Sequence, residues 1–290
     1  MRLAMVERAG RAVLVVMTPA GPRGLAADHP EYPGDLDELL ARGADLRAVG
    51  ERLCAAPVVR PDGAGFLPPL RRPGKIVCVG FNYRDHSTEA GVVDLPDFPS
   101  LFARFSSTLT GHEQVIEFPS VSSQLDYEGE LAVVIGGGGR GIAEKDALGH
   151  VAGYSIFNDA SIRDYQFKTS QWLVGKNFDR TGGFGPWLVT PDELPPGCAG
   201  LHIRTRLNGQ VMQEASTSAM LFDVAKIIVI VSEIMTLSPG DVIITGTPSG
   251  VGYARTPPVF MKAGDVCEVE IEGIGVLRNR IERRKEAGDR

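Results

Sequence analysis

Cysteine is scarce in this sequence, and the few cysteines stand far apart. The 290 residues include four of them, Cys54, Cys78, Cys198 and Cys267, with no Cys-x-x-Cys pair. Cys78 and Cys267 lie in apolar, strand-like runs, a context that favours buried free thiols over a zinc site or disulfides. Neither a zinc centre nor a disulfide-stabilised fold is therefore expected.

An excess of positive charge and long apolar runs are missing as well. The formal net charge is −6 and no basic stripe occurs, which argues against nucleic acid as the main ligand. The apolar run at residues 12–17 is too short to span a membrane, and its surroundings lack the layout of a signal peptide. The sequence therefore predicts a cytoplasmic protein that binds neither nucleic acid nor membrane.

The composition that remains is typical of a globular protein. Hydrophobic residues make up 43% and charged residues 23% of the chain. Residues 1–70 predict a small N-terminal α/β module, and a proline-rich stretch at 57–73 leads into a second domain over 71–290. In that domain short strands outnumber long helices, and hairpin turns such as Asn208-Gly209 connect strands. The pattern favours a mostly-β, α+β fold over a doubly wound sheet.

The carboxylates that stand out lie in two apolar segments that predict strands. Because side chains alternate along a strand, Asp126, Glu128 and Glu130 are expected on one face. Like charges repel and carboxylates near a core are costly to desolvate, and a bound cation would remove both costs. Asp159 ends the second segment and can supply a further ligand to Mg²⁺, Mn²⁺ or Ca²⁺. The alternative is a solvated edge strand whose acids face water.

His86 and Glu89 follow the strand-like run 75–80, on a segment that Asn82 could cap and Gly91 could end as a short helix. On a helix, residues three apart share a face. A carboxylate beside an imidazole orients the ring and raises its basicity, as a general base requires. The pair therefore predicts a catalytic dyad, with an exposed surface pair as the alternative.

Two cations are candidates for contacts with an anionic substrate. Arg104 lies in a short predicted strand and could hold a carboxylate with both arms of its guanidinium. Lys176 stands between apolar runs and a glycine turn, so it could point into a cleft, although solvent is the usual place of a lysine.

The glycine-rich run 136–141 satisfies G-x-G-x-x-G and follows a predicted strand. The acids of that strand would repel a pyrophosphate, and the helical piece that follows is too short for a crossover helix. A dinucleotide site is therefore rejected in favour of a turn.

Five motifs carry a family resemblance. In order they are Gly80-x-Asn82-Tyr83-x-x-His86-x-x-Glu89, Leu125-Asp126-Tyr127-Glu128-x-Glu130-Leu131, Phe157-Asn158-Asp159, Gly175-Lys176-x-Phe178-Asp179 and Thr245-Gly246-Thr247-Pro248-x-Gly250-Val251-Gly252. Over about residues 75–281 the sequence resembles the fumarylacetoacetate hydrolase family. The resemblance implies a mixed β-sandwich roll of the fumarylacetoacetase C-terminal type, usually dimeric, with a divalent metal. Members cleave acylpyruvates and related diketo acids, and others hydrate, isomerise or decarboxylate similar 2-oxo acids.

The resemblance also implies roles for single residues. The matching positions are the metal ligands Glu128, Glu130 and Asp159, the catalytic dyad His86 and Glu89 on a mobile lid, the active-site lysine Lys176, and the substrate-carboxylate contact Thr247. The sequence departs from the family at Arg104, where many members have lysine, and at 180–183, where many have a proline-containing stretch. Both positions are expected near the substrate, so the resemblance leaves the substrate open.

The expected function is hydrolysis of a carbon–carbon bond in an acylpyruvate or related diketo acid, assisted by a divalent metal, with Mg²⁺ ahead of Mn²⁺ and Ca²⁺. His86, held by Glu89, would activate water, and Lys176 would stabilise the developing oxyanion. The alternatives are a decarboxylase, hydratase or isomerase that uses the same site, and a catalytically idle small-molecule-binding protein. The expected partners are a small 2-oxo or diketo acid and a second copy of the chain, since the apolar helix predicted over 222–235 and the family both indicate a homodimer.

Overall fold

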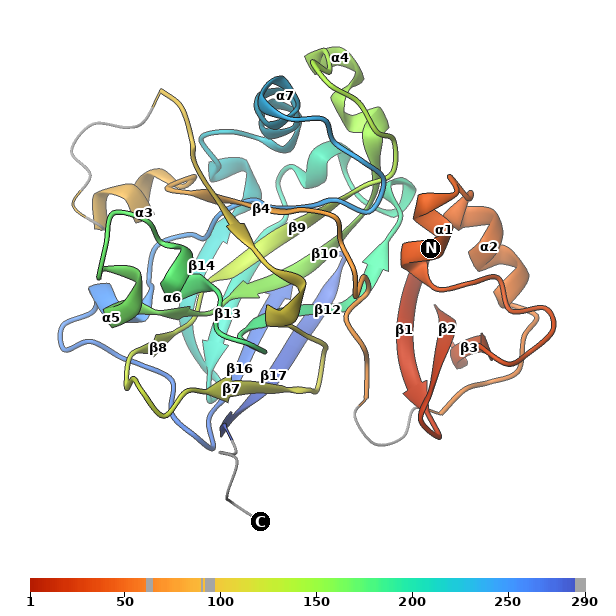
Figure 1. Ribbon diagram of the computed structural model, residues 1–290, viewed down its shortest axis with the longest axis horizontal. Helices are drawn as coiled ribbons and strands as arrows, with labels where there is room; N and C mark the ends of the chain where they lie inside the picture. Colours follow the sequence, from red (N-terminus) through yellow and green to blue (C-terminus); the bar gives the residue numbers. More distant parts are fainter. Residues whose placement is uncertain (61–64, 90, 92–96, 285–290) are drawn as a thin grey trace.

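The computed structural model describes residues 1–60, 65–89, 91 and 97–284, and most of its regular structure is β-sheet (Figure 1). The largest sheet has ten strands in the order β3-β2-β1-β12-β10-β9-β15-β4-β5, and β6 pairs with β12 beside this path. Its strands are β1 (Arg2–Arg8), β2 (Arg11–Thr18), β3 (Gly21–Ala26), β4 (Ile76–Gly80), β5 (Ser100–Arg104), β6 (Leu109–Thr110), β9 (Gly129–Ile135), β10 (Val151–Asp159), β12 (Gly182–Val189) and β15 (Val242–Ile244).

A second sheet has five strands in the order β14-β13-β16-β17-β7, and a third has only β11 and β8. The strands of these two sheets are β7 (Val115–Phe118), β8 (Leu125–Asp126), β11 (Ser161–Ile162), β13 (His202–Leu207), β14 (Gln210–Ser216), β16 (Val266–Ile271) and β17 (Gly275–Arg283). The predicted hairpin at Asn208 is present, because the turn there joins β13 to β14, and Asn208 has the positive φ of 52° that such turns require.

Helices are short and few. They are α1 (Leu36–Ala41), α2 (Leu46–Leu53), α3 (Arg84–Glu89), α4 (Glu144–Ala147), α5 (Arg163–Gln166), α6 (Leu173–Lys176) and α7 (Val224–Ile234), with 3-10 turns at Ser106–Thr108, Leu148–His150, Pro191–Glu193, Pro196–Cys198, Thr217–Ala219 and Gly252–Ala254. Within the described residues, none of these helices has both the length and the apolar character needed to cross a membrane. The prediction of a mostly-β, α+β fold is confirmed.

The main core lies between the two large sheets. Leu131 and Ile156 of the ten-stranded sheet belong to one apolar cluster with Ile203, Val269 and Leu277 of the five-stranded sheet, and each of the five is at most 1% exposed. Full burial of such side chains contributes about 1.5–3 kcal/mol each. This sandwich holds β9, which carries Glu130 and directly follows Glu128, and β10, which ends at Asp159.

The N-terminal module is continuous with this frame. Strand β1 pairs with β12 through Arg2↔Val189 and Leu3↔Leu188, so the ten-stranded sheet runs through both parts of the chain. Figure 1 shows the module at one end of the molecule, beside β12, with α3, α5 and α6 gathered at the opposite end. The continuous sheet thus marks no domain boundary near residue 70, and the division into 1–70 and 71–290 stays a prediction.

The apolar helix expected over 222–235 forms as α7 and packs into the chain's own core. Ile227, Ile228 and Val231 on this helix are at most 1% exposed and belong to the main apolar cluster. Because the core of a single chain accounts for this burial, the helix alone does not require a second copy. The homodimer stays a prediction that rests on the family resemblance.

Candidate active site

Three carboxylates converge where β9 and β10 lie side by side. One oxygen each from Glu128, Glu130 and Asp159 lies within 4.8 Å of the others, and the three residues are at most 5% exposed. The backbone N–H of Asp159 donates to the carbonyl of Glu128 at 2.9 Å, which fixes the two segments side by side. The acidic cluster predicted from strand alternation is therefore present as a buried group.

Gly129 explains why the two glutamates share a face. A Cβ placed on Gly129 would lie 2.2 Å from Thr205 Oγ1 and 2.9 Å from Val269 Cγ1, both on the facing sheet. Only glycine fits there, because real Cβ atoms do not approach neighbours so closely. Since successive side chains alternate, the residues on either side of Gly129 must point to the opposite face, where the cluster forms.

The electrostatics of the cluster are uneven. Burial opposes ionisation of Glu128, but the charges of Lys176 and Arg163 outweigh it and lower the pKa of Glu128 to about 2. Burial raises the pKa of Glu130 well above its usual value, and the negative charges of Asp159 and Glu128 raise it further. A divalent cation would relieve this repulsion, and three carboxylate oxygens are ligands that hard ions prefer. The residues present therefore fit a divalent metal such as Mg²⁺ or Mn²⁺.

Lys176 lies inside the cluster and not in solvent. It is the last residue of α6 and is 2% exposed. Its Nζ lies 2.7 Å from Glu128 Oε2 and 2.6 Å from Asp159 Oδ2. The lysine thus contributes a buried positive charge beside the metal-ligand candidates, the position expected for a group that stabilises negative charge on a substrate.

Arg104, predicted as a substrate-binding residue, lies behind the cluster. Its Nη1 donates to Asp159 Oδ1 at 2.5 Å, and its Nη2 donates to Thr181 Oγ1 at 2.8 Å. The side chain is fully buried and does not line the cavity described below. Because its donors bind protein partners, this geometry supports a role in holding Asp159 and not the bidentate contact to substrate that the sequence predicted.

The dyad residues lie at the other side of the cluster. His86 Nδ1 is 3.4 Å from Glu89 Oε2, and both oxygens of Glu89 accept from the backbone N–H of Gly250 at 3.0 Å. His86 is 6% exposed, so the surface-pair alternative does not describe it. With Glu89 at Nδ1, Nε2 is the ring nitrogen that can meet a substrate. Residues 92–96, expected to form part of a mobile lid with this helix, lie outside the described residues.

Asn82 anchors α3 in a way that the sequence did not predict. It was expected to cap the helix, but its Nδ2 donates to the carbonyls of Phe222 at 2.9 Å and Thr245 at 2.7 Å. Its Oδ1 accepts from the N–H of Phe222 at 2.7 Å. The buried amide therefore ties the base of α3 to the end of β15 and the start of α7.

A small cavity of about 40 Å³ connects these groups. Its polar lining residues are His86, Glu128, Glu130, Arg163, Gln166, Lys176 and Thr247, and its aromatic ones are Phe81, Phe102, Phe167, Trp172 and Tyr253. Thr247 Oγ1 donates to the carbonyl of Gly129 at 3.0 Å and accepts from Gln213 Nε2 at 2.8 Å, so its position is fixed. The cavity therefore combines anchored polar groups with an aromatic wall, as small-molecule sites do.

Arg163 is the site residue that the sequence reasoning missed. Its Nε donates to Asp126 Oδ2 at 2.8 Å, and its Nη1 lies 2.6 Å from Glu128 Oε1 and 2.8 Å from Gln166 Oε1. Its Nη2 is buried and has no hydrogen-bond partner among the described residues. A buried guanidinium donor of this kind is suited to a substrate carboxylate. Its position four residues after Asp159 was the available signal, but the sequence indicated only a helix start there.

Asp126 belongs to the support of the site and not to the metal-ligand candidates. It was expected on the same face as the two glutamates, but it lies in β8, paired with Ser161. Its oxygens accept from the N–H groups of Gly252 at 2.7 Å and Tyr253 at 3.0 Å, in addition to Arg163. Asp126 therefore joins Arg163 to the loop that also holds Glu89.

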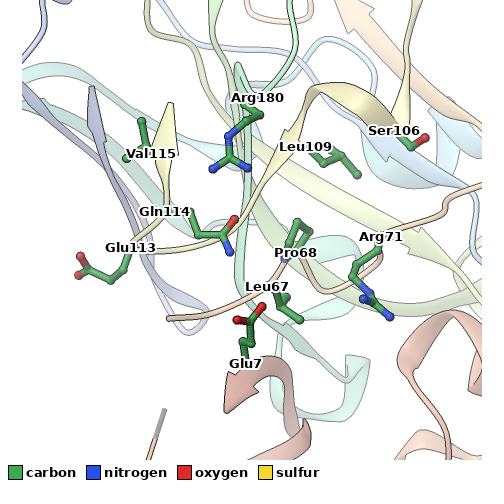
Figure 2. Close-up of a pocket in the computed structure, with 10 residues that line it drawn as sticks. All are labelled: Glu7, Leu67, Pro68, Arg71, Ser106, Leu109, Glu113, Gln114, Val115 and Arg180. Carbon is green, nitrogen blue, oxygen red and sulfur yellow. The ribbon is translucent and has the colours of Figure 1, made fainter. Parts of the chain in front are cut away.

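A larger cavity elsewhere lacks these features. It measures about 540 Å³ and is shown in Figure 2, where Arg71, Glu113 and Arg180 stand on different sides of the hollow. All three charges already have partners, since Arg71 lies 3.1 Å from Asp35, Arg180 lies 3.1 Å from Glu117 and Glu113 lies 2.9 Å from Arg278. No convergent set of carboxylates lines it, so the smaller cavity is the candidate active site.

Comparison with known proteins identifies the same region. The family model for the fumarylacetoacetate (FAA) hydrolase C-terminal domain matches residues 75–282, a range that includes every residue placed in the site above. The mitochondrial oxaloacetate tautomerase FAHD2A of Homo sapiens is 42% identical over 265 residues, which cover 90% of this chain and 84% of that protein.

Two solved structures share the whole fold. The fumarylacetoacetate hydrolase of Exiguobacterium antarcticum is 39% identical, with a TM-score of 0.84 over 98% of this chain and 100% of that one. Maleylpyruvate hydrolase from Sphingobium sp. SYK-6, solved with manganese(II) ion and pyruvate, is 26% identical, with a TM-score of 0.79 over 98% of this chain and 100% of that one. The resemblance seen in the sequence is thereby confirmed, and the chain belongs to the fumarylacetoacetate hydrolase family.

Proposed function

We propose that this protein is a metal-dependent tautomerase that interconverts the keto and enol forms of a compact 2-oxo dicarboxylic acid of the oxaloacetate type. The observation that carries the proposal is the cavity of about 40 Å³, in which an acidic cluster, a histidine and an unpaired arginine donor meet. The 42% identity to an oxaloacetate tautomerase over 90% of this chain supports the same substrate class.

The proposed cofactor is a divalent ion at Glu128, Glu130 and Asp159, with Mg²⁺ first and Mn²⁺ or Ca²⁺ as the alternatives. When bound, such an ion supplies Lewis-acid polarisation of a 2-oxo acid. The manganese(II) and pyruvate in the related maleylpyruvate hydrolase structure support both the kind of ion and the kind of ligand.

The chain's own residues supply binding and proton transfer. Arg163 and Thr247 line the cavity and are placed at the carboxylate ends of the substrate, where Arg163 has the unpaired donor Nη2 and the Thr247 hydroxyl would have to turn from the Gly129 carbonyl to donate. His86, oriented by Glu89, takes a proton from the carbon beside the keto group and delivers it to the oxygen of the resulting enolate, which gives the enol; in the reverse direction it carries the proton from that oxygen back to the carbon. Lys176 donates to the oxygen on which negative charge develops. No attacking water is required in this sequence of events.

A second candidate is the hydrolysis of an acylpyruvate, the function expected from the sequence. The pairing of buried His86 with partly buried Glu89 favours it, because an oriented imidazole can also activate water. The related maleylpyruvate hydrolase shares the fold. Decarboxylation of a 2-oxo acid would use the same groups without water, so product analysis must separate the three reactions.

The first prediction separates these reactions. With Mg²⁺-loaded protein, keto–enol exchange of oxaloacetate is expected to accelerate in proportion to enzyme concentration, as followed by proton NMR. Acylpyruvates incubated in parallel are expected to stay uncleaved, because the proposed proton transfer by His86 provides no attacking water. Cleavage of an acylpyruvate with no change in the exchange rate of oxaloacetate would establish the hydrolase instead.

A second prediction concerns Asp126, which we propose as a positioning residue for Arg163. Asp126→Asn keeps the size of the side chain but removes the charge that faces Arg163 Nε at 2.8 Å. A buried charged hydrogen bond contributes about 1.5–3 kcal/mol, so the KM for oxaloacetate is expected to rise by about tenfold or more. Affinity for Mg²⁺ is expected to change far less, because Asp126 is not among the proposed ligands.

The matched control is Asp164→Asn, since Asp164 bonds to Ser122 at 2.6 Å and does not line the cavity. The KM for oxaloacetate and the affinity for Mg²⁺ are measured for both variants. Equal losses of Mg²⁺ affinity and substrate affinity in Asp126→Asn would contradict a role through Arg163.

A further inference from the structure

Trp172 occupies an unusual position in the segment between α5 and α6. Residues 167–171 and 173–174 are exposed, whereas Trp172 is partly buried and lines the cavity. The ring thus reaches inward from an otherwise exposed segment. Figure 1 shows this part of the chain beside α3, the helix that carries His86.

The ring is held on three sides. A Cβ on Gly80 would lie 2.4 Å from Trp172 Cζ3, so the ring rests directly on the Gly80 backbone. Trp172 also packs edge-to-face against Phe81, at a centroid distance of 5.2 Å, and against Phe102, at 5.5 Å. Such pairs favour a defined ring orientation. Phe81 has a φ of 57°, which is rare for a bulky residue and shows how strongly the surroundings fix this corner.

The other aromatic residues of the wall are less able to limit the length of a ligand. Phe167 is 57% exposed and leans on Tyr253, with a ring-centroid distance of 5.7 Å, at the outside of the cavity. Phe102 faces the cluster, since Lys176 Nζ lies 5.0 Å from its ring centroid. Trp172 is therefore the partly buried large side chain that the segment between α5 and α6 places in the cavity wall.

We propose that Trp172 is the specificity-determining residue of this site and that it restricts the enzyme to compact 2-oxo acids. Residues at the cluster bind the 2-oxo acid end, and the indole blocks the space that the acyl chain of a longer diketo acid would need. The proposal rests on the proposed function for the identity of the bound end. Beyond that function, the proposal identifies Trp172 as the residue that rejects longer members of the same substrate class.

The test measures ligand length against affinity. Mg²⁺-loaded wild-type protein and Trp172→Ala are titrated calorimetrically with oxalate, oxamate and N-alkyl oxamates of increasing chain length. Wild-type affinity is expected to fall with chain length. In Trp172→Ala the affinity for the longest ligand relative to oxalate is expected to rise by about tenfold or more, since pocket fit discriminates by about that factor per misplaced group.

Controls keep the outcome decisive. Leu173→Ala removes an exposed neighbour that does not line the cavity and is expected to leave the ratio unchanged. If circular dichroism shows that Trp172→Ala does not fold, Trp172→Phe retains an aromatic ring and is expected to shift the ratio in the same direction by a smaller factor. An unchanged ratio in a folded variant, or wild-type affinity that does not fall with length, would overturn the role of Trp172. Failure to accelerate oxaloacetate tautomerisation, with the ratio shifted as expected, would overturn only the proposed function.

Discussion

Glu130→Gln is expected to abolish turnover because it removes one of the three carboxylates that would hold the metal. The substitution keeps the size of the side chain and can preserve an acceptor for the Gly246 N–H, which now donates to Glu130 Oε2 at 2.5 Å. The affinity for Mg²⁺ should fall by about two orders of magnitude or more, since even residues that only support metal ligands are worth about 10–100-fold. Activity should fall with metal occupancy and recover in part at high Mg²⁺ concentration.

Metal titration and turnover are measured on the same preparation, with chelator-treated wild-type protein as the reference. Glu117→Gln is the matched control, because Glu117 pairs with Arg180 at 3.1 Å and does not line the cavity. Full wild-type activity in excess chelator, with metal analysis showing an empty protein, would rule out the metal centre. Full activity of Glu130→Gln at low Mg²⁺ would remove this residue from the ligand set.

His86→Ala is expected to separate binding from chemistry. Oxaloacetate tautomerisation should slow by roughly two to four orders of magnitude, the usual contribution of a positioned acid–base group. Mg²⁺ and oxalate should still bind, because none of the groups proposed to hold them lies on α3. Exchange kinetics by NMR test the loss of catalysis, and oxalate titration of the same sample tests the retained binding.

His29→Ala serves as the control, since His29 is exposed in the loop after β3. Acylpyruvate cleavage assayed beside tautomerisation shows whether any hydrolysis also depends on His86. A variant that tautomerises oxaloacetate at the parent rate with metal bound would leave the dyad without a catalytic role.

The acidic cluster could be predicted from sequence because alternation places Glu128 and Glu130 on one face. The same rule did not show that the β-ladder is interrupted at residues 127 and 128 and that Asp126 pairs in a separate two-stranded sheet with Ser161. Alternation is a local rule, so it cannot reveal where a strand breaks and changes partner. The carboxylate of Asp126 binds Arg163 and the N–H groups of Gly252 and Tyr253.

The two buried arginines, Arg104 and Arg163, show a second limit of prediction from the sequence. Arg104 was assigned to the substrate and Arg163 was assigned to no function, yet the cavity is lined by Arg163 and not by Arg104. Both follow or end short strands, and their long side chains reach partners that are distant in sequence, 55 residues away for the Arg104–Asp159 pair. Which arginine meets a ligand depends on which one has a donor left over, and only the assembled structure determines that.

The close approach at Gly129 limits how this centre can be altered by evolution or by design. The strand position that directs the two glutamates to one face is fixed from its reverse side, by Thr205 and Val269 on another sheet. An attempt to change ion preference by lengthening β9 or by introducing a β-bulge into it would require changes in both the ten-stranded and the five-stranded sheet. Asp159, at the end of β10, is held instead by the side chains of Arg104 and Lys176. Variation in ion preference among relatives of this chain should therefore be sought at that strand end and in the residues that hold it.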